Sequence, residues 1–164
     1  MSKVISVELS NKSIDKAIAD LRKYKTWVAE KEQELRSRLA EIGKEVAEMR
    51  FSAAIYDGTN DVQVEVSDDG NTAVITASGT SVVFIEFGSG VTYGYGHPLA
   101  SKNNFEPGSW SEGEKGKGHW DNPDGWYYKH GEKSLGNPPS MAMYNAVQRL
   151  SEQLTQIARE VFSQ

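Results

Sequence analysis

Residues 62–87 read VQVEVSDDGNTAVITASGTSVVFIEF, and this stretch decides the fold class. Valines alternate with polar residues from Val62 to Val66, which is the period of a half-buried strand. Asp68-Asp69-Gly70-Asn71 then supplies residues typical of a hairpin turn. Two further apolar runs follow, at 73–77 and 81–87. The stretch therefore predicts an antiparallel meander of three strands.

The preceding residues, 11–50, predict a long amphipathic helix. Asn11 or Ser13 is expected to cap its start. A helix of this length would be longer than a small domain is wide, so we expect a break near 24–28 or at Gly43. Packing of its apolar stripe on the sheet is the favoured use, and a coiled coil is the alternative. The stripe steps by three, four or seven residues through Ile14, Ile18, Leu21, Val28, Leu35, Leu39, Ile42, Val46 and Met49.

The C-terminal residues, 140–162, predict a second helix. Pro138-Pro139-Ser140 is expected to open it, because proline suits the first turn. A short strand is expected at 4–9. Together these elements predict one α+β domain over 1–164, in which a three- to four-stranded antiparallel sheet (51–87) is packed by the N-terminal and C-terminal helices. The stripe of the second helix is Met143, Val147, Leu150, Leu154, Ile157 and Val161.

The segment 88–139 differs in kind from the rest of the chain. It holds 11 of the 15 glycines, all five prolines and all three histidines, and no helix or strand period continues through it. Loops of this length are usually functional or disordered, and the eight aromatic residues here argue against disorder. We expect an extended loop arm that projects from the domain.

Composition and charge narrow the classes of function. The 164 residues contain no cysteine, which excludes disulfides, thiolate zinc sites and a thiol nucleophile. The formal charge of −5 argues against nucleic-acid binding through a broad basic face. No apolar run is long enough to cross a bilayer, and the N-terminus does not resemble a signal peptide. We therefore expect a protein that is kept in the cytoplasm or packaged from there, without a membrane partner.

A zinc site, a serine nucleophile and a phosphate-binding loop are each conceivable in the arm, but the residues of the arm lack the spacing or the residue types that each of them needs. His97, His119 and His130 are too widely spaced for a zinc motif, so we expect them to form hydrogen bonds within the loop instead. Gly88-Ser89-Gly90 lacks the five-residue elbow of a serine hydrolase, and 113–118 lacks the Ser or Thr of a phosphate loop. We expect no cofactor and no catalytic residue. Acid–base catalysis by two carboxylates of the arm is less favoured than simple solvation of Glu106, Glu112, Glu114, Asp121, Asp124 and Glu132.

Aromatic residues give the arm its sharpest functional signal, because such side chains dominate the energetics of interfaces. Three uses remain open: stacking platforms for sugars, anchors inserted into neighbouring subunits, or packing back onto the domain's own sheet. The aromatic residues are Tyr93, Tyr95, Phe105, Trp110, Trp120, Trp126, Tyr127 and Tyr128.

The order of several short motifs resembles a known family. An apolar run ends in Glu86 and Phe87 and is followed by a turn with Gly88 and Gly90. Next come Trp-Tyr-Tyr at 126–128 and then Gly136-Asn137-Pro138-Pro139 before a helix that contains Met143 and Ala146. This order resembles the tail-component family of HK-type lambdoid siphophages, whose founding member is that phage's gene product ten. The resemblance covers roughly residues 45–162. It departs at 57–61, where Asp-Gly-Thr-Asn-Asp stands in place of the Asp-Thr-Gly-x-Leu of many members.

The resemblance implies a non-enzymatic virion protein of the neck or tail-completion type, present in the host cytoplasm during assembly. Copies of the chain, about six, would form a ring at the head–tail junction around the DNA passage. The implied partners are further copies of itself, the phage connector or head-completion protein, and a tail-tube or tail-terminator protein. The residues expected to lock neighbouring subunits are Trp110, Trp120, Trp126, Tyr127 and Tyr128.

The charge of segment 51–87 suggests how DNA would pass such a ring. All six of its charged residues are acidic, and an acidic wall would repel phosphates and let the duplex slide without sequence-specific binding. The expected channel-facing acids are Asp57, Asp61, Glu65, Asp68 and Asp69. A carbohydrate-binding or cell-wall-hydrolysing module that uses the aromatic arm is the alternative function, and a dimeric coiled-coil adaptor is a third.

Overall fold

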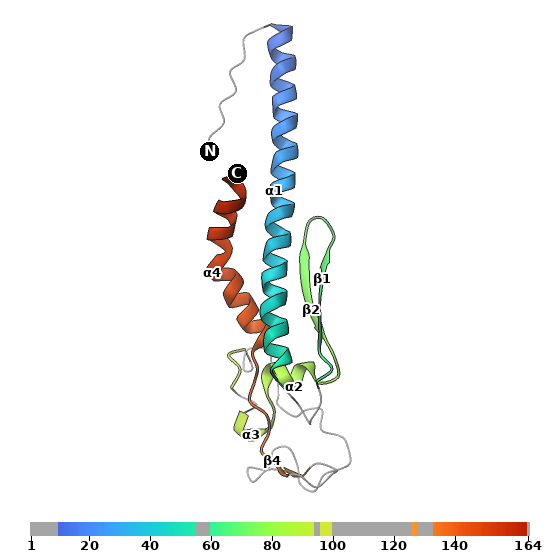
Figure 1. The fold of residues 1–164 in the computed structure, drawn as a ribbon, viewed down its shortest axis with the longest axis vertical. Coiled ribbons are helices and arrows are strands. Elements are labelled where there is room, and N and C mark those ends of the chain that lie inside the picture. The colour runs from blue at the N-terminus through green and yellow to red at the C-terminus, as the bar shows by residue number, and fades with distance from the viewer. Residues whose placement is uncertain (1–9, 55–59, 94–95, 100–125, 128–132, 164) are drawn as a thin grey trace.

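The computed structural model describes residues 10–54, 60–93, 96–99, 126–127 and 133–163, and its fold is α+β, as expected (Figure 1). A long helix forms the axis of the molecule, a second helix lies along one side of it, and a hairpin lies along the other. In chain order the elements are α1 (Asn11–Ser52), β1 (Gln63–Asp68), β2 (Ala73–Ser78), α2 (Val82–Phe87), α3 (Gly90–Tyr93), β3 (Trp126–Tyr127), β4 (Lys133–Ser134) and α4 (Ala142–Phe162).

Helix α1 runs for 42 residues, about 63 Å at a rise of 1.5 Å per residue. The expected break near 24–28 is wrong. Tyr24 stacks on Trp27 there with ring centroids 5.6 Å apart, and Trp27 meets Phe162 of α4 edge to face at 5.9 Å. Aromatic packing therefore supports the helix where the apolar stripe is interrupted.

The ends of α1 are capped by residues outside the helix. Ser10, rather than Asn11 or Ser13, is the N-cap, and its Oγ accepts a hydrogen bond from the Ser13 N–H at 3.3 Å. At the other end, Asn60 Nδ2 donates to the carbonyl of Phe51 at 2.6 Å. These bonds satisfy backbone groups that have no partner inside the helix.

Gly43 does not break α1 but lets other elements approach it. A Cβ at this position would collide with Ile75 Cδ1 of β2 and lie 3.0 Å from Leu150 Cδ1 of α4. Packing against β2 and α4 thus accounts for the part of the apolar stripe around Gly43. The core continues from this crossing through Ala47, Phe51, Val64, Ile85, Ala142 and Ala146.

The hairpin of β1 and β2 confirms the first two strands of the predicted meander. The strands pair antiparallel, from Gln63 opposite Ser78 to Asp68 opposite Ala73. The turn between them includes Gly70, whose φ of +90° suits glycine.

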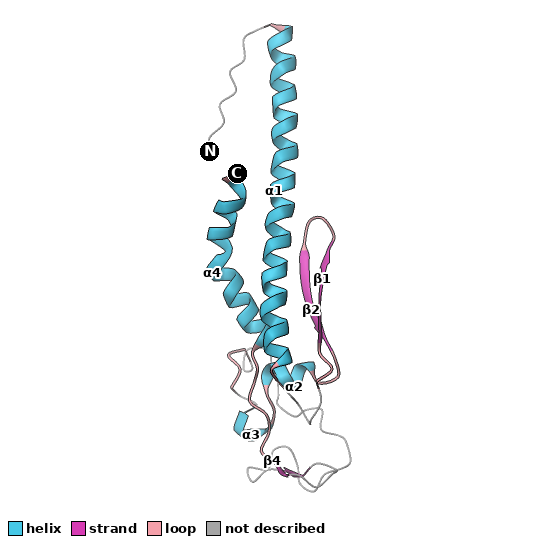
Figure 2. Cartoon of the chain, in the orientation of Figure 1, coloured by secondary structure: helices cyan, strands magenta, loops and turns pink. Residues whose placement is uncertain are grey.

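The predicted third strand, 81–87, is instead the helix α2 (Figure 2). Its apolar residues include Val82 and Ile85, and short runs of this kind fit a strand or a buried helix equally well. In this helix Ile85 packs in the core, and its neighbour Glu86 is buried as well. The sheet therefore has two strands, and α2 turns the chain under the end of α1.

Helix α4 begins at Ala142 and not at Pro138–Ser140 as predicted. The residues before it are held by α2: the Ser140 N–H donates to the Ile85 carbonyl at 2.8 Å, and the Met141 N–H donates to the Glu86 carbonyl at 3.2 Å. Met141 also has a left-handed backbone conformation, with φ +52°, so the regular helix starts only after it.

Parts of the segment 88–139 have regular structure, contrary to expectation. Helix α3 lies within it, and β3 pairs antiparallel with β4, Trp126 opposite Ser134. The rest of the predicted arm, 100–125 and 128–132, and the predicted strand at 4–9 lie outside the described residues.

Candidate functional site

The turn after α2 and the segment before α4 lie against each other. The Ser89 N–H donates to the Asn137 carbonyl at 2.9 Å, and the Asn137 N–H donates to Ser89 Oγ at 3.1 Å. The two motifs, Glu86–Gly90 and Gly136–Pro139, are 45 residues or more apart in the chain. In the fold they form one packing unit.

Glycine is required on both sides of this contact. Gly88 has φ +79°, and a Cβ there would lie 2.9 Å from Pro139 Cδ. Gly136 has φ +99°, and a Cβ there would collide with the Ser89 carbonyl oxygen. Any L side chain would therefore have both an unfavourable φ and too little space.

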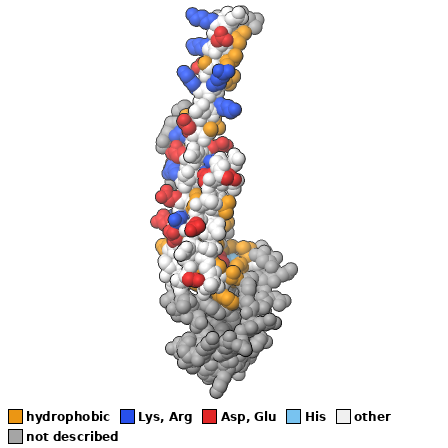
Figure 3. Space-filling view, turned by 90° about the vertical axis from the view of Figure 1, so that its right-hand side faces the viewer, with side chains coloured by type: hydrophobic (Ala, Val, Ile, Leu, Met, Phe, Trp, Pro, Cys, Tyr) orange, Lys and Arg blue, Asp and Glu red, His pale blue; other side chains and the backbone are white. Residues whose placement is uncertain are grey.

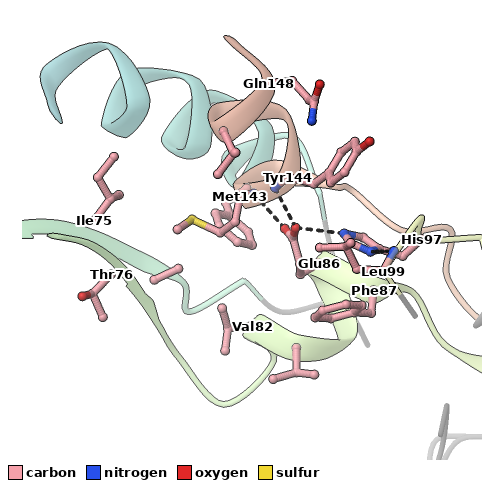
Figure 4. A pocket seen from close by; sticks show the side chains of 14 residues that line it. Ile75, Thr76, Val82, Glu86, Phe87, His97, Leu99, Met143, Tyr144 and Gln148 are labelled. Atoms are coloured by element: carbon pink, nitrogen blue, oxygen red, sulfur yellow. Dashed lines mark hydrogen bonds and ion pairs between the residues drawn. The ribbon is translucent and has the colours of Figure 1, made fainter. Parts of the chain in front are cut away.

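Glu86 joins α2 to the first turn of α4 (Figure 4). Its Oε2 accepts from the Met143 N–H and its Oε1 from the Tyr144 N–H, both at 3.0 Å. The residue is only 6% exposed, and the N-cap of α4, Met141, makes no side-chain capping bond of its own. Glu86 thus supplies the cap from a distant element, and its negative charge lies at the positive end of the helix dipole.

His97 lies against the same carboxylate and is 4% exposed. Its Nε2 is 3.2 Å from Glu86 Oε1, and its Nδ1 accepts from the Leu99 N–H at 3.0 Å. Because Nδ1 acts as the acceptor, this network assigns the neutral tautomer with its proton on Nε2, pointing toward Glu86. The ring packs between Phe87, at a centroid distance of 4.3 Å, and Tyr144, at 5.5 Å.

The bonds of this cluster are structural in character. Both carboxylate oxygens of Glu86 hold backbone amides, and both ring nitrogens of His97 have partners. The arrangement orders α2, α4 and residues 96–99 relative to one another.

A groove of about 630 Å³ opens beside this cluster (Figure 4). Its walls come from the end of α1, from β2, α2 and α4, and from Leu99. Its lining is mostly apolar, so it suits aliphatic or aromatic side chains better than a polar substrate. Lining residues include Phe51, Val82, Phe87, Leu99, Met143 and Val147.

Two of the expected channel-facing acids order the ends of the hairpin. Asp61 Oδ2 accepts from Thr80 Oγ1 at 2.5 Å and from the Thr80 N–H at 2.8 Å, and these bonds hold the pKa of Asp61 below its ordinary value. At the turn, Asp69 Oδ1 accepts from the Thr72 N–H at 2.7 Å and the Asn71 N–H at 2.8 Å. These bonds likewise lower the pKa of Asp69.

The other expected acids have different surroundings. Asp68 pairs with Arg36 of α1 at 3.3 Å, Glu65 is exposed opposite Thr76 in the register, and Asp57 lies outside the described residues. The four described acids are thus spread from the base of the hairpin to its tip. Their part in a channel stays a prediction.

Of the aromatic residues expected at a subunit interface, only two lie in the described part of the chain. Trp126 and Tyr127 form β3, opposite Ser134 and Lys133 of β4. The remaining three, Trp110, Trp120 and Tyr128, lie outside it.

Sequence reasoning missed what Glu86 and His97 do. The available signal was a carboxylate inside an apolar run, because a buried charge needs hydrogen-bond partners. For His97, hydrogen bonding within the loop was favoured over a metal site, but nothing in the sequence indicated Glu86 as its partner. Within the described residues no three His, Asp or Glu side chains form a metal-binding group, and His119 and His130 lie outside those residues.

Comparison with known proteins adds no identification: no family model, curated protein or solved structure matches the chain. Among the described helices, none combines the length and apolar character needed to span a bilayer.

Proposed function

We propose that the chain is a non-enzymatic structural subunit of a bacteriophage virion, of the neck or tail-completion type. In this proposal about six copies assemble into a ring at the head–tail junction, around the passage for DNA. The subunit would be made in the host cytoplasm and retained in the virion. Its partners would be its own copies, a connector or head-completion protein, and a tail-tube or tail-terminator protein.

The observation that supports the proposal is that the motif residues have structural roles inside the subunit. Glu86 caps α4, and Gly88 and Gly136 allow two segments to pack closely. The residues on which the family resemblance rests therefore preserve a shape, as expected for a subunit whose role is to fit its neighbours.

The exposed surface supports the same conclusion. Large apolar side chains lie at the surface of α1 and α4, among them Leu21 at 55% exposure and Val147 at 57%. Exposed apolar patches of soluble proteins commonly mark interaction sites. They are consistent with a subunit that completes its packing only on assembly.

The test is the absolute mass of the purified protein by light scattering, alone and mixed with a candidate connector or tail-tube protein. The proposal predicts particles near six times the monomer mass of 18.1 kDa, or larger. A strict monomer under both conditions would count against it.

The carbohydrate-binding alternative is separated from the proposal by tryptophan fluorescence. Several cell-wall glycans would be titrated into the monomer and into the assembled protein. We expect no change in emission, whereas saturable quenching by one glycan would favour the alternative.

A further inference from the structure

His97 makes two hydrogen bonds that respond differently to an added proton (Figure 4). Its Nε2 lies 3.2 Å from Glu86 Oε1, and its Nδ1 accepts from the Leu99 N–H at 3.0 Å. Neutral imidazole offers one donor and one acceptor, whereas imidazolium is a donor at both nitrogens. Proton uptake at Nδ1 therefore strengthens the bond with Glu86 by charge and turns the contact with Leu99 into one between two donors.

The imidazole ring is the part of this contact that stays in place. It packs between the rings of Phe87 and Tyr144, at centroid distances of 4.3 and 5.5 Å, and its side chain is 1% exposed. Turning the ring over would also break its bond with Glu86. A proton on Nδ1 consequently displaces the backbone of Leu99 and not the ring of His97.

The backbone that follows His97 has little else to hold it. Pro98 has no N–H, and in the described part of the chain the bond to Nδ1 is the one hydrogen bond that Leu99 makes. Leu99 also lines the apolar groove. Loss of this bond therefore frees a part of the groove wall.

The charged surroundings of His97 keep the change local. Among the described residues, the ionisable groups that face its ring are Glu86 of α2 and Tyr144 of α4, and no Lys or Arg lines the groove. The Glu86 carboxylate also accepts from the N–H groups of Met143 and Tyr144, so α4 stays capped in both states of the histidine. The proton thus affects Leu99 and leaves the contact between α2 and α4 in place.

We propose that His97 is a pH-sensitive switch on the groove: uptake of a proton releases Leu99 from the groove wall, and loss of the proton restores the contact. Histidine is the side chain that ordinarily changes its charge between pH 5 and 8, and carboxyl groups ordinarily do so at lower pH. The switch lies within one subunit and does not depend on the proposed function.

Hydrogen exchange of the Leu99 amide in the full-length protein tests the switch. Protection factors from NMR at pH 7.5 and pH 5.5 correct for the intrinsic effect of pH on exchange. We expect the protection of Leu99 to fall by about fivefold or more at the lower pH, the scale of one net hydrogen bond. Protection of the Ala47 amide, inside α1, should stay within about twofold. In the same samples, the ¹⁵N shifts of the His97 ring should show a proton on Nε2 alone at pH 7.5 and on both nitrogens at pH 5.5.

Two variants separate the roles of the two ring nitrogens. His97→Asn places an oxygen acceptor two residues before the Leu99 N–H, as in an Asx-turn, and it does not titrate. Its Leu99 protection should therefore be the same at both pH values. His97→Gln keeps a donor toward Glu86 but has no acceptor at the position of Nδ1, so Leu99 should exchange rapidly at both. Circular dichroism at both pH values checks that the helices remain folded.

Four results would overturn the switch. They are an imidazole that stays neutral at pH 5.5, a protonated imidazole with unchanged exchange at Leu99, the wild-type pH dependence in His97→Asn, and an equal loss of protection at Ala47, which would mean global unfolding. The mass of the assembled protein is a separate readout, so the switch and the ring can fail independently.

Discussion

The Glu86 carboxylate connects α2 to α4. Its two partners in α4, the N–H groups of Met143 and Tyr144, lie 57 and 58 positions further along the chain. A buried carboxylate is costly unless hydrogen bonds replace its water, and here two backbone amides and His97 do so. The same bonds give partners to backbone N–H groups in the first turn of α4, because the side chain of the N-cap residue, Met141, makes no capping bond. One side chain of α2 thereby caps α4.

Replacing this charge should destabilise the subunit. Glu86→Gln keeps the size of the side chain but loses the negative charge at the helix N-terminus, so we expect the free energy of unfolding to fall by about 2 kcal/mol. The measurement is urea unfolding followed by circular dichroism. Glu65→Gln, on the exposed face of the hairpin, is the matched control and should change stability by less than about 0.5 kcal/mol. Equal effects would contradict the capping role.

Gly70 and Gly136 allow the cost of a positive φ to be compared with the added cost of close packing. Gly136 and Gly70 both have positive φ, but a Cβ at Gly136 would collide with Ser89, whereas Gly70 has nothing within 4 Å. We expect Gly70→Ala to cost about 1 kcal/mol through φ alone and Gly136→Ala about 3 kcal/mol. Thermal unfolding of both variants provides the test, and an equal loss would mean that the packing at Gly136 is unimportant.

Asp61 sets a pH dependence with a definite sign. Its bonds with Thr80 lower its pKa, so the unfolded chain takes up the proton at a higher pH than the folded chain. The stabilisation is present above the ordinary pKa of about 4 and is lost as the pH falls through the lowered value. Asp61→Asn should therefore lose less stability than wild type as the pH falls below about 4. Urea unfolding across that range checks the difference, and parallel curves would refute it.

At the level of elements, local patterns predicted most of the fold. The stripes of α1 and α4 and the alternation of β1 are periodic, and a period reports which face is buried without reference to the rest of the chain. The turn at Gly70 was predicted for the same reason. These features depend on neighbours within one element, so the sequence displays them directly.

Nonlocal contacts explain the predictions that were wrong. The run ending in Phe87 was assigned to a strand because it is a short apolar run, and such a run fits a strand or a buried helix equally well; the chain forms a helix there. The start of α4 was placed too early because the bonds from α2 to Ser140 join distant parts of the chain. The cap by Glu86 and the site of His97 could not be predicted for the same reason.

A prediction for the packing of elements concerns Gly43 of α1. It lies where α1 meets both β2 and α4, so Gly43→Leu should force these elements apart and lower stability by about 2 kcal/mol. Ala29→Leu, at an exposed position of the same helix, is the control and should be nearly neutral. Urea unfolding distinguishes them; a neutral Gly43→Leu would show that the crossing tolerates a large side chain.

At the scale of the whole molecule, α1 is longer than the elements that pack on it (Figure 1). The hairpin and α4 pack on α1 from Trp27 toward its C-terminus, whereas Ile14, Ile18 and Leu21 near its N-terminus are exposed. Figure 3 shows apolar and basic side chains together at this end of the molecule.

Electron microscopy of the assembled wild-type protein tests the proposed ring most directly. The account predicts closed rings of about six subunits with one rotational axis and a central opening. Particles that are only monomers, two-fold dimers or open filaments, at concentrations well above those of the light-scattering experiment, would contradict it.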